Sequence, residues 1–168
     1  SLLGDAVGTV STTTDEPSLA DDSAMAGGLS NVAEAGQTIY AVSGVDVNTA
    51  VACEVGGNMR LFQRVSYAGT ATIGNEGLND TLCSASQVSW MTLEGVGTVE
   101  DADAQALMQT LLDNASYQST GMSGSGSLHI GLTNGLTLQL LVGDDTVSAC
   151  GTWSCPEFFE SFHEAIGH

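Results

Sequence analysis

The sequence is almost without basic residues. It has 168 residues, no lysine and two arginines, Arg60 and Arg64, against 20 acidic residues, so its formal net charge is −18. Binding to nucleic acid requires a stripe of basic residues that displaces counterions from the phosphates, and two arginines cannot form such a stripe. Direct binding to an anionic membrane surface is excluded for the same reason. A Walker-type phosphate loop would need the missing lysine.

Long hydrophobic runs are also missing. The chain has no apolar window of about 18 residues, so we expect no transmembrane helix. No charged stretch leads into an apolar one as in a signal peptide. Because the chain starts at Ser1, we expect a mature or trimmed protein from which a leader or anchor has been removed.

The surplus of negative charge comes from missing bases rather than from added acids. Asp and Glu make up roughly 12% of the residues, which is close to their average usage. We therefore interpret the charge as a property of a lysine-free surface on an ordinary core. The alternative is a selected acidic surface that serves a basic partner or cations.

Four cysteines are present, and their spacing predicts disulfides. There is no Cys-x-x-Cys pair, which argues against a zinc site and against a thioredoxin-like motif. Of the three pairings, we favour Cys150–Cys155, which closes a tight loop, together with Cys53–Cys83. This pairing predicts an oxidising compartment. The alternative is free buried thiols that pack as small hydrophobic groups.

The pattern of apolar residues predicts strands followed by helices in both halves of the chain. In the first half we expect a short strand over 6–12, a broken helix after Asp15-Glu16-Pro17, and strands over 38–42, 50–55 and 59–65 with a turn at 56–58. In the second half we expect a strand over 87–96, a helix over 100–115, a hairpin over 128–140, a strand over 146–150, a loop over 151–154 and a helix over 156–166.

The register of the 128–140 hairpin can be predicted from its buried face. A two-residue loop would pair Leu132 with Thr137 and mix apolar with polar side chains. A three-residue loop pairs Leu132 with Leu136 and, further along, Ile130 with Leu138 and Leu128 with Leu140. Because the buried face sets the register, we predict the three-residue loop, with Gly135 at positive φ.

These elements predict an α+β fold. We expect an antiparallel sheet with the helices at 101–114 and 156–166 packed on one face. An N-terminal region over 1–36 and a main domain over 37–168 are the expected divisions. Residues 6–65 and 87–166 can also be read as two related units of strand, helix and further strands.

Several of these features resemble a known group of proteins. The order Tyr-x-Val-x-Gly-x-Asp from Tyr40 to Asp46 precedes a strand and a hairpin, and a Phe-rich helix closes the chain. Over about residues 38–166, the sequence resembles small extracytoplasmic domains of anaerobic Gram-positive gut bacteria. Those domains are lipoproteins or are tethered to membrane segments, and they have no established activity. The resemblance implies a secreted or membrane-anchored location, and the cysteines are not part of its pattern.

Few residues suggest chemistry. Glu160, His163 and Glu164 share one face of the last helix and could reach one cation, but we favour a solvated face opposite the Phe residues and predict no metal site. Trp90 and Trp153 are candidates for a binding surface, with packing against a strand as the alternative. A nucleophile elbow and a calcium loop are both missing from the sequence, and no catalytic residue or cofactor is predicted.

We therefore expect a non-catalytic binding or sensory module, part of the bacterial cell envelope, whose partner is an unidentified protein or small ligand. One alternative is a cation-dependent hydrolase that uses the last helix around His163. The other is an acidic inhibitor or adaptor that docks on a basic protein.

Overall fold

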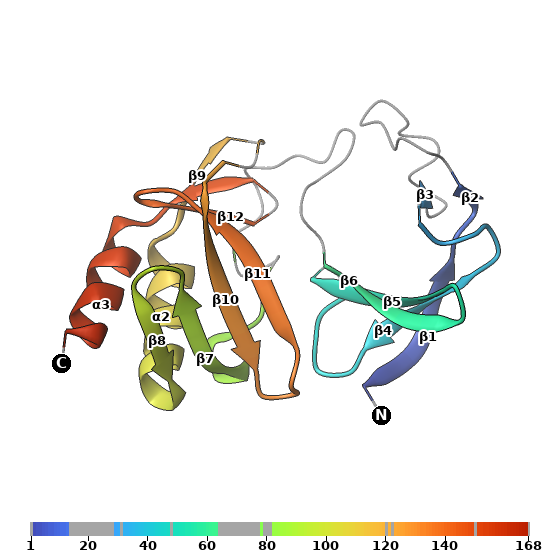
Figure 1. Ribbon diagram of the computed structural model, residues 1–168, viewed down its shortest axis with the longest axis horizontal. Coiled ribbons are helices and arrows are strands. Elements are labelled where there is room, and N and C mark those ends of the chain that lie inside the picture. The colour runs from blue at the N-terminus through green and yellow to red at the C-terminus, as the bar shows by residue number, and fades with distance from the viewer. Residues whose placement is uncertain are drawn as a thin grey trace. The chain divides into compact units, whose positions relative to one another are not determined.

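The chain forms two compact units, Ser1–Thr72 and Ile73–His168 (Figure 1). The computed structural model describes residues 2–13, 29–30, 32–47, 49–63, 78, 82–119, 121, 123–149 and 151–167. The helix expected after Pro17, the end of the strand at Arg64-Val65, and Cys150 lie outside the described residues.

The first unit is built on a four-stranded antiparallel sheet. Its strands are ordered β1 (Leu3–Thr9), β4 (Thr38–Val42), β5 (Ala50–Val55) and β6 (Asn58–Gln63). A short parallel pair, β2 (Thr12–Thr13) and β3 (Leu29–Ser30), lies beside it. The observed bounds of β4 and β5 confirm the strands predicted from the sequence.

The turn between β5 and β6 is tighter than predicted. Gly56 and Gly57 have φ angles of 59° and 78°, and Asn58 already pairs with Val55 across the hairpin. A two-residue turn with positive φ at both positions matches the twist of the strands, and glycine adopts this backbone most easily. The predicted turn at 56–58 was therefore one residue too long.

The second unit contains a seven-stranded antiparallel sheet and two helices. The strand order is β8 (Gly97–Glu100), β7 (Val88–Leu93), β10 (Gly126–Leu132), β11 (Thr137–Val142), β12 (Thr146–Ser148), β13 (Thr152–Ser154) and β9 (Ser116–Ser119). A 3₁₀ turn, η2 (Ala85–Gln87), precedes β7. With the two antiparallel sheets and the helices, the predicted α+β class is confirmed.

The β10–β11 hairpin has the predicted register. Leu128 lies opposite Leu140 and Ile130 opposite Leu138. The backbone N–H of Leu132 donates to the carbonyl of Leu136 at 2.8 Å, and the φ angle of Gly135 is 87°. The buried apolar face therefore fixed the loop length, as the alternation of side chains in a strand requires.

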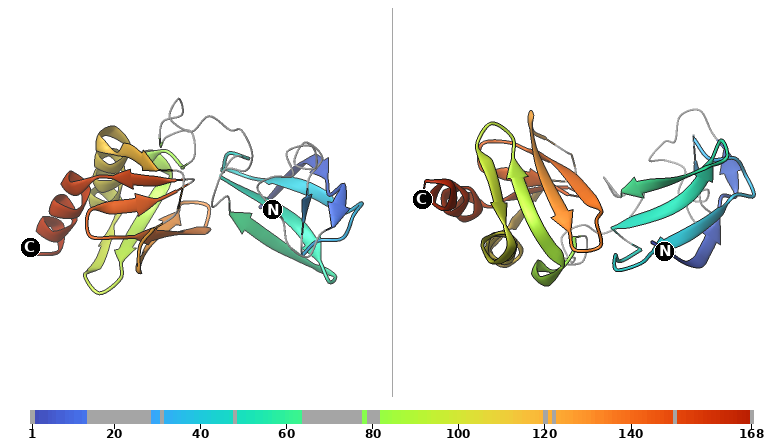
Figure 2. Two further views of the ribbon diagram at one scale, coloured as in Figure 1. Left: turned by 90° about the horizontal axis from the view of Figure 1, so that it is seen from above. Right: turned by 60° about the horizontal axis from the view of Figure 1, so that its bottom comes forward.

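Both predicted helices of the second unit are present. Helix α2 (Asp101–Asn114) packs against β7 and against α3 (Pro156–Ile166) (Figure 2). Leu107, Met108 and Leu111 of α2 are buried, as are Phe158 and Phe162 of α3. Within the described residues, no helix is long and apolar enough to cross a membrane.

The predicted disulfides are not seen. Cys53, Cys83 and Cys155 are free thiols, and all three are buried. Cys53 belongs to the first unit and Cys83 to the second, and because both thiols are free, the favoured Cys53–Cys83 pair is not formed in the structure. Free Cys155 likewise leaves the predicted Cys150–Cys155 bridge without support. The thiols pack as small hydrophobic groups, the alternative that the sequence left open.

Candidate functional site

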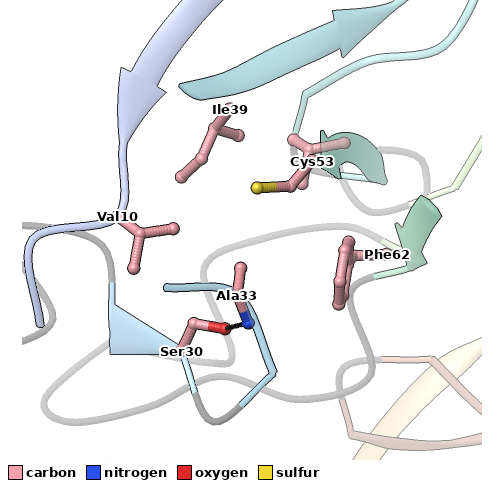
Figure 3. Close-up of a pocket in the computed structure, with 7 residues that line it drawn as sticks. Val10, Ser30, Ala33, Ile39, Cys53 and Phe62 are labelled. Atoms are coloured by element: carbon pink, nitrogen blue, oxygen red, sulfur yellow. Dashed lines mark hydrogen bonds between the residues drawn. The ribbon is translucent and has the colours of Figure 1, made fainter. Parts of the chain in front are cut away.

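The first unit contains an apolar hollow with a volume of about 170 Å³. One wall is a face of the sheet, where Ile39 pairs with Cys53 and Val51 pairs with Phe62. The opposite wall comes from the segments that follow β1 and β3. Figure 3 shows side chains from both walls pointing into the same space. The described lining residues are Val10, Ser30, Ala33, Ile39, Val51, Cys53 and Phe62.

The two polar side chains of the hollow are already engaged with the neighbouring backbone. The hydroxyl oxygen of Ser30 accepts the backbone N–H groups of Val32 and Ala33 at 3.1 and 2.9 Å (Figure 3). The thiol of Cys53 donates to the carbonyl of Glu54 at 3.7 Å. The described lining includes no carboxylate, imidazole or basic group, so the thiol of Cys53 is its only usual group for proton transfer.

Backbone hydrogen bonds fix the wall opposite the sheet. The N–H of Val10 donates to the carbonyl of Gln37 at 2.8 Å, and the N–H of Gly36 donates to the carbonyl of Val10 at 2.7 Å. The N–H of Ala35 donates to the hydroxyl of Thr13 at 3.1 Å. The segment 32–37 is thereby held against residues 10–13. The hollow is thus a formed feature of this unit and is bounded on two sides by hydrogen-bonded backbone.

A second hollow lies on the second unit beside α3 and has a volume of about 250 Å³. Buried Leu93, Val142 and Phe159 form its floor. Glu94 and Asp144, which are exposed, stand at its rim. The described lining also includes Val96, Ser125, Gly126, Gly143 and His163. This groove combines an apolar floor with acidic side chains.

The structure brings only one of the three predicted metal-ligand candidates to a hollow. His163 lines the groove beside α3, whereas Glu160 and Glu164 are exposed on the same helix and do not line it. Among the described residues, no group of three or more His, Cys, Asp or Glu side chains is placed to hold a metal ion. These three residues form the polar face of α3, opposite the buried Phe residues.

The two tryptophans differ in their surroundings. Trp153, which was a candidate for a surface, is 3% exposed, and its indole N–H donates to the carbonyl of Ala149 at 2.9 Å. Its ring also makes an edge contact with Tyr117, with 5.5 Å between the ring centroids. Trp153 is therefore a core residue and offers no binding surface. Trp90 is half-buried on β7, with its ring directly over Gly131 of the next strand.

The buried thiols of the second unit are not poised as nucleophiles. Burial raises the pKa of Cys83 to about 11, from an ordinary 9.0. Burial, together with the negative charges of Glu157 and Asp145, raises the pKa of Cys155 to about 12. The thiolate is the reactive form of cysteine, so both side chains stay protonated and unreactive near neutral pH.

Comparison with known proteins gives no relative. No protein-family profile, curated protein or solved structure matches the chain.

The sequence contains no motif that marks the apolar hollow. Its lining comes from three distant parts of the chain, around residues 10, 30–33 and 39–62. Valine, alanine, isoleucine and phenylalanine at these positions have the composition of any core. The pairing of the strands, the hydrogen bonds of Val10 and that between Ala35 and Thr13 bring these segments together, and none of these contacts can be read from a local pattern.

Proposed function

We propose that the protein is a non-catalytic binding or sensory module whose first unit takes up a small apolar group in the hollow between Val10, Ile39, Cys53 and Phe62. The observation that supports this function is the chemistry of the lining. Its apolar side chains face one another, and its two polar atoms already contact the backbone. An apolar lining recognises an apolar group and performs no proton transfer on it.

The size of the hollow suits a small ring or a short branched chain. Its volume is about 170 Å³. An enclosed apolar protein cavity of about 150 Å³ stays free of water and binds benzene or xenon, and this hollow has a similar volume but is partly open to solvent. Water that enters such a space finds few hydrogen-bond partners, so an apolar group that displaces it loses no affinity by breaking hydrogen bonds. The group to be bound is therefore of benzene size: a small ligand, a part of a larger ligand, or one apolar side chain of a partner.

The proposed place of action is the extracytoplasmic side of a bacterial cell, as a secreted or membrane-anchored protein. This proposal is supported by the resemblance of the segment around Tyr40–Asp46 and of the Phe-rich last helix to extracytoplasmic domains. The cysteines no longer support it, because those described are free. Digestion of intact native cells with an added protease tests the location: a protein that survives until the cells are lysed would contradict it.

Titration with benzene tests the proposed binding site. We expect the amide NMR signals of Val10, Ala33 and Cys53 to shift with a dissociation constant on the order of 1 mM, a value typical of so small a ligand. Ala33 is 2% exposed, so Ala33→Leu extends into the hollow and should abolish these shifts. The matched control is Ala6→Leu, at an exposed position of β1, which should leave them unchanged.

Two results of this titration would contradict the proposal. In the first, benzene shifts no signal of the hollow at concentrations up to its solubility. In the second, the shifts persist unchanged in a folded Ala33→Leu variant. If Ala33→Leu does not fold, Ala33→Val adds less volume and should weaken binding at least about threefold, because it still reduces the space available.

A further inference from the structure

We propose that the groove beside α3 on the second unit docks a lysine or arginine side chain from an extended basic segment of a partner protein. The site differs from the apolar hollow of the first unit and does not depend on it. Three features support the proposal: the layout of the groove, the charge of the unit around it, and the shape of a basic side chain.

The groove has an apolar floor and a charged rim that come from different elements. Leu93 at the end of β7, Val142 at the end of β11 and Phe159 of α3 are between 5% and 7% exposed and form the floor. Glu94 follows β7, and Asp144 lies in the turn after β11. Both carboxylates are exposed, and the structure gives neither of them a hydrogen bond or ion pair within the described residues.

Bare backbone forms part of the groove wall. Gly126 and Gly143 line the groove, and an added Cβ would come within 3.0 Å of Val142 Cγ2 and 2.6 Å of Thr146 Oγ1, respectively. A side chain at either position would have to displace its neighbours. At these two positions the groove is lined by backbone without a side chain, which an extended peptide can approach closely.

The charge around the groove is not compensated. Eight of the 20 acidic residues lie in Ser1–Thr72 and twelve in Ile73–His168, and both arginines belong to the first of these segments. The second unit thus has no lysine or arginine at all. Near the groove, the negative charges of Glu157 and Asp145 add to the effect of burial in raising the pKa of the Cys155 thiol, at the start of α3. A cationic partner meets an attractive field here, and no lysine or arginine of the unit competes for these carboxylates.

A lysine or arginine side chain matches this arrangement in shape as well as in charge. Its aliphatic stem covers apolar surface while its cationic head stays near water. Placed in the groove, the stem lies on Leu93, Val142 and Phe159, and the head reaches Glu94 and Asp144. A bare metal ion would gain nothing from the apolar floor.

Binding of short peptides to the full-length protein tests this assignment. The probes are fluorescein-labelled peptides of alternating glycine and lysine, and the same peptides with diaminopropionate in place of lysine. Diaminopropionate has three fewer methylenes, and at about pH 5.5, where the comparison is made, its more acidic side-chain ammonium is protonated like that of lysine. At about 0.15 M salt, where distant charges are screened, we expect the lysine peptide to bind roughly tenfold more tightly, because its stem buries apolar surface.

Charge-neutral variants locate the site. Glu94→Gln combined with Asp144→Asn should weaken binding of the lysine peptide about fivefold to tenfold, since exposed ion pairs have modest strength. The matched control is Asp5→Asn combined with Glu34→Gln, which makes the same change in net charge on exposed positions of the first unit. It should weaken binding less than twofold.

Four outcomes would overturn the assignment. Equal weakening by both pairs of substitutions would show diffuse charge attraction only. Equal affinity of the lysine and diaminopropionate peptides would show that the floor plays no part. The third is an absence of binding at millimolar peptide. The fourth is concentration-dependent dimerisation of the protein that Glu94→Gln with Asp144→Asn removes, which would assign the groove to a second copy of the chain.

Discussion

At the scale of single residues, Trp90 can approach β10 closely because Gly131 of that strand has no side chain. A Cβ on Gly131 would lie 2.0 Å from both Cε2 and Nε1 of the indole ring. The ring therefore lies directly on the backbone of the neighbouring strand and covers a part of the sheet that carries no side chain. Trp90 is best understood as packing on this sheet rather than as a free binding surface.

Gly131→Ala should destabilise the second unit by roughly 1–3 kcal/mol, because the added methyl group displaces the ring of Trp90. We expect a lower urea midpoint and a red-shifted tryptophan emission as the indole moves toward water. Gly121→Ala is the control: its Cβ meets no atom within 4 Å, so the change in stability should stay within about 0.5 kcal/mol. An unchanged midpoint and emission for Gly131→Ala would contradict this packing.

The buried thiols predict a loss of stability in alkali. Burial raises the pKa of Cys83 to about 11 and that of Cys155 to about 12. Below pH 9 both thiols are protonated in the folded and the unfolded chain, so their ionisation takes nothing from the free energy of unfolding. As the pH rises from 9 through 11 to 12, the unfolded chain loses its protons first, and the folded state is increasingly disfavoured.

Urea unfolding at pH 8 and at about pH 10.5 measures this effect. The fall in stability between the two pH values should be smaller in a variant with Cys83→Ala and Cys155→Ala than in the natural sequence. Alkylation by iodoacetamide at pH 8 should also be slow in the folded protein and fast in guanidinium. An identical pH dependence in both proteins would mean that these thiols are not shielded from water.

At the scale of elements, the buried face of α3 is a cluster of three phenylalanine rings. Phe158 is fully buried, and its ring centroid lies 5.2 Å from that of Phe159 and 5.8 Å from that of Phe162. Both ring pairs are edge-on, the arrangement that aromatic rings favour. The spacing of these three residues along one helix face is why α3 could be predicted from sequence.

Phe158→Ala should cost about 3–5 kcal/mol, because it removes a buried ring and leaves a cavity. Urea denaturation followed through the emission of buried Trp153 measures the change in the second unit. The control is Glu160→Ala on the exposed face of the same helix, with an expected change within about 0.5 kcal/mol. A cost below about 1 kcal/mol for Phe158→Ala would show that α3 packs loosely.

Elements with a strong local pattern could be predicted from the sequence, and short paired strands could not. Helix α2, strands β4 and β5 and the register of β10–β11 follow from apolar periodicity and turn residues. Strand β13 (Thr152–Ser154) was expected to be a loop. It has only three residues and is a strand because β12 and β9 pair with it on either side. Such pairing partners cannot be identified from local propensity.

At the scale of the whole molecule, the two units carry different surface chemistry. In the part of the chain that the structure describes, all seven exposed large hydrophobic side chains, from Leu2 to Leu61, belong to the first unit. The second unit holds twelve of the 20 acids and no lysine or arginine. This difference is consistent with the proposed uptake of an apolar group by the first unit and the proposed docking of a basic side chain by the second. The net charge can be counted from the sequence, but the division of exposed apolar and acidic side chains between two units could not be predicted from it.

The central claim is that the hollow of the first unit takes up a small apolar group, and a crystal pressurised with xenon tests it most directly. Xenon occupies apolar cavities of this size and scatters X-rays strongly. We predict a xenon atom among Val10, Ile39, Cys53 and Phe62, and its loss in crystals of Ala33→Leu. A hollow that holds ordered water instead, or that stays without xenon while other cavities fill, would contradict the claim.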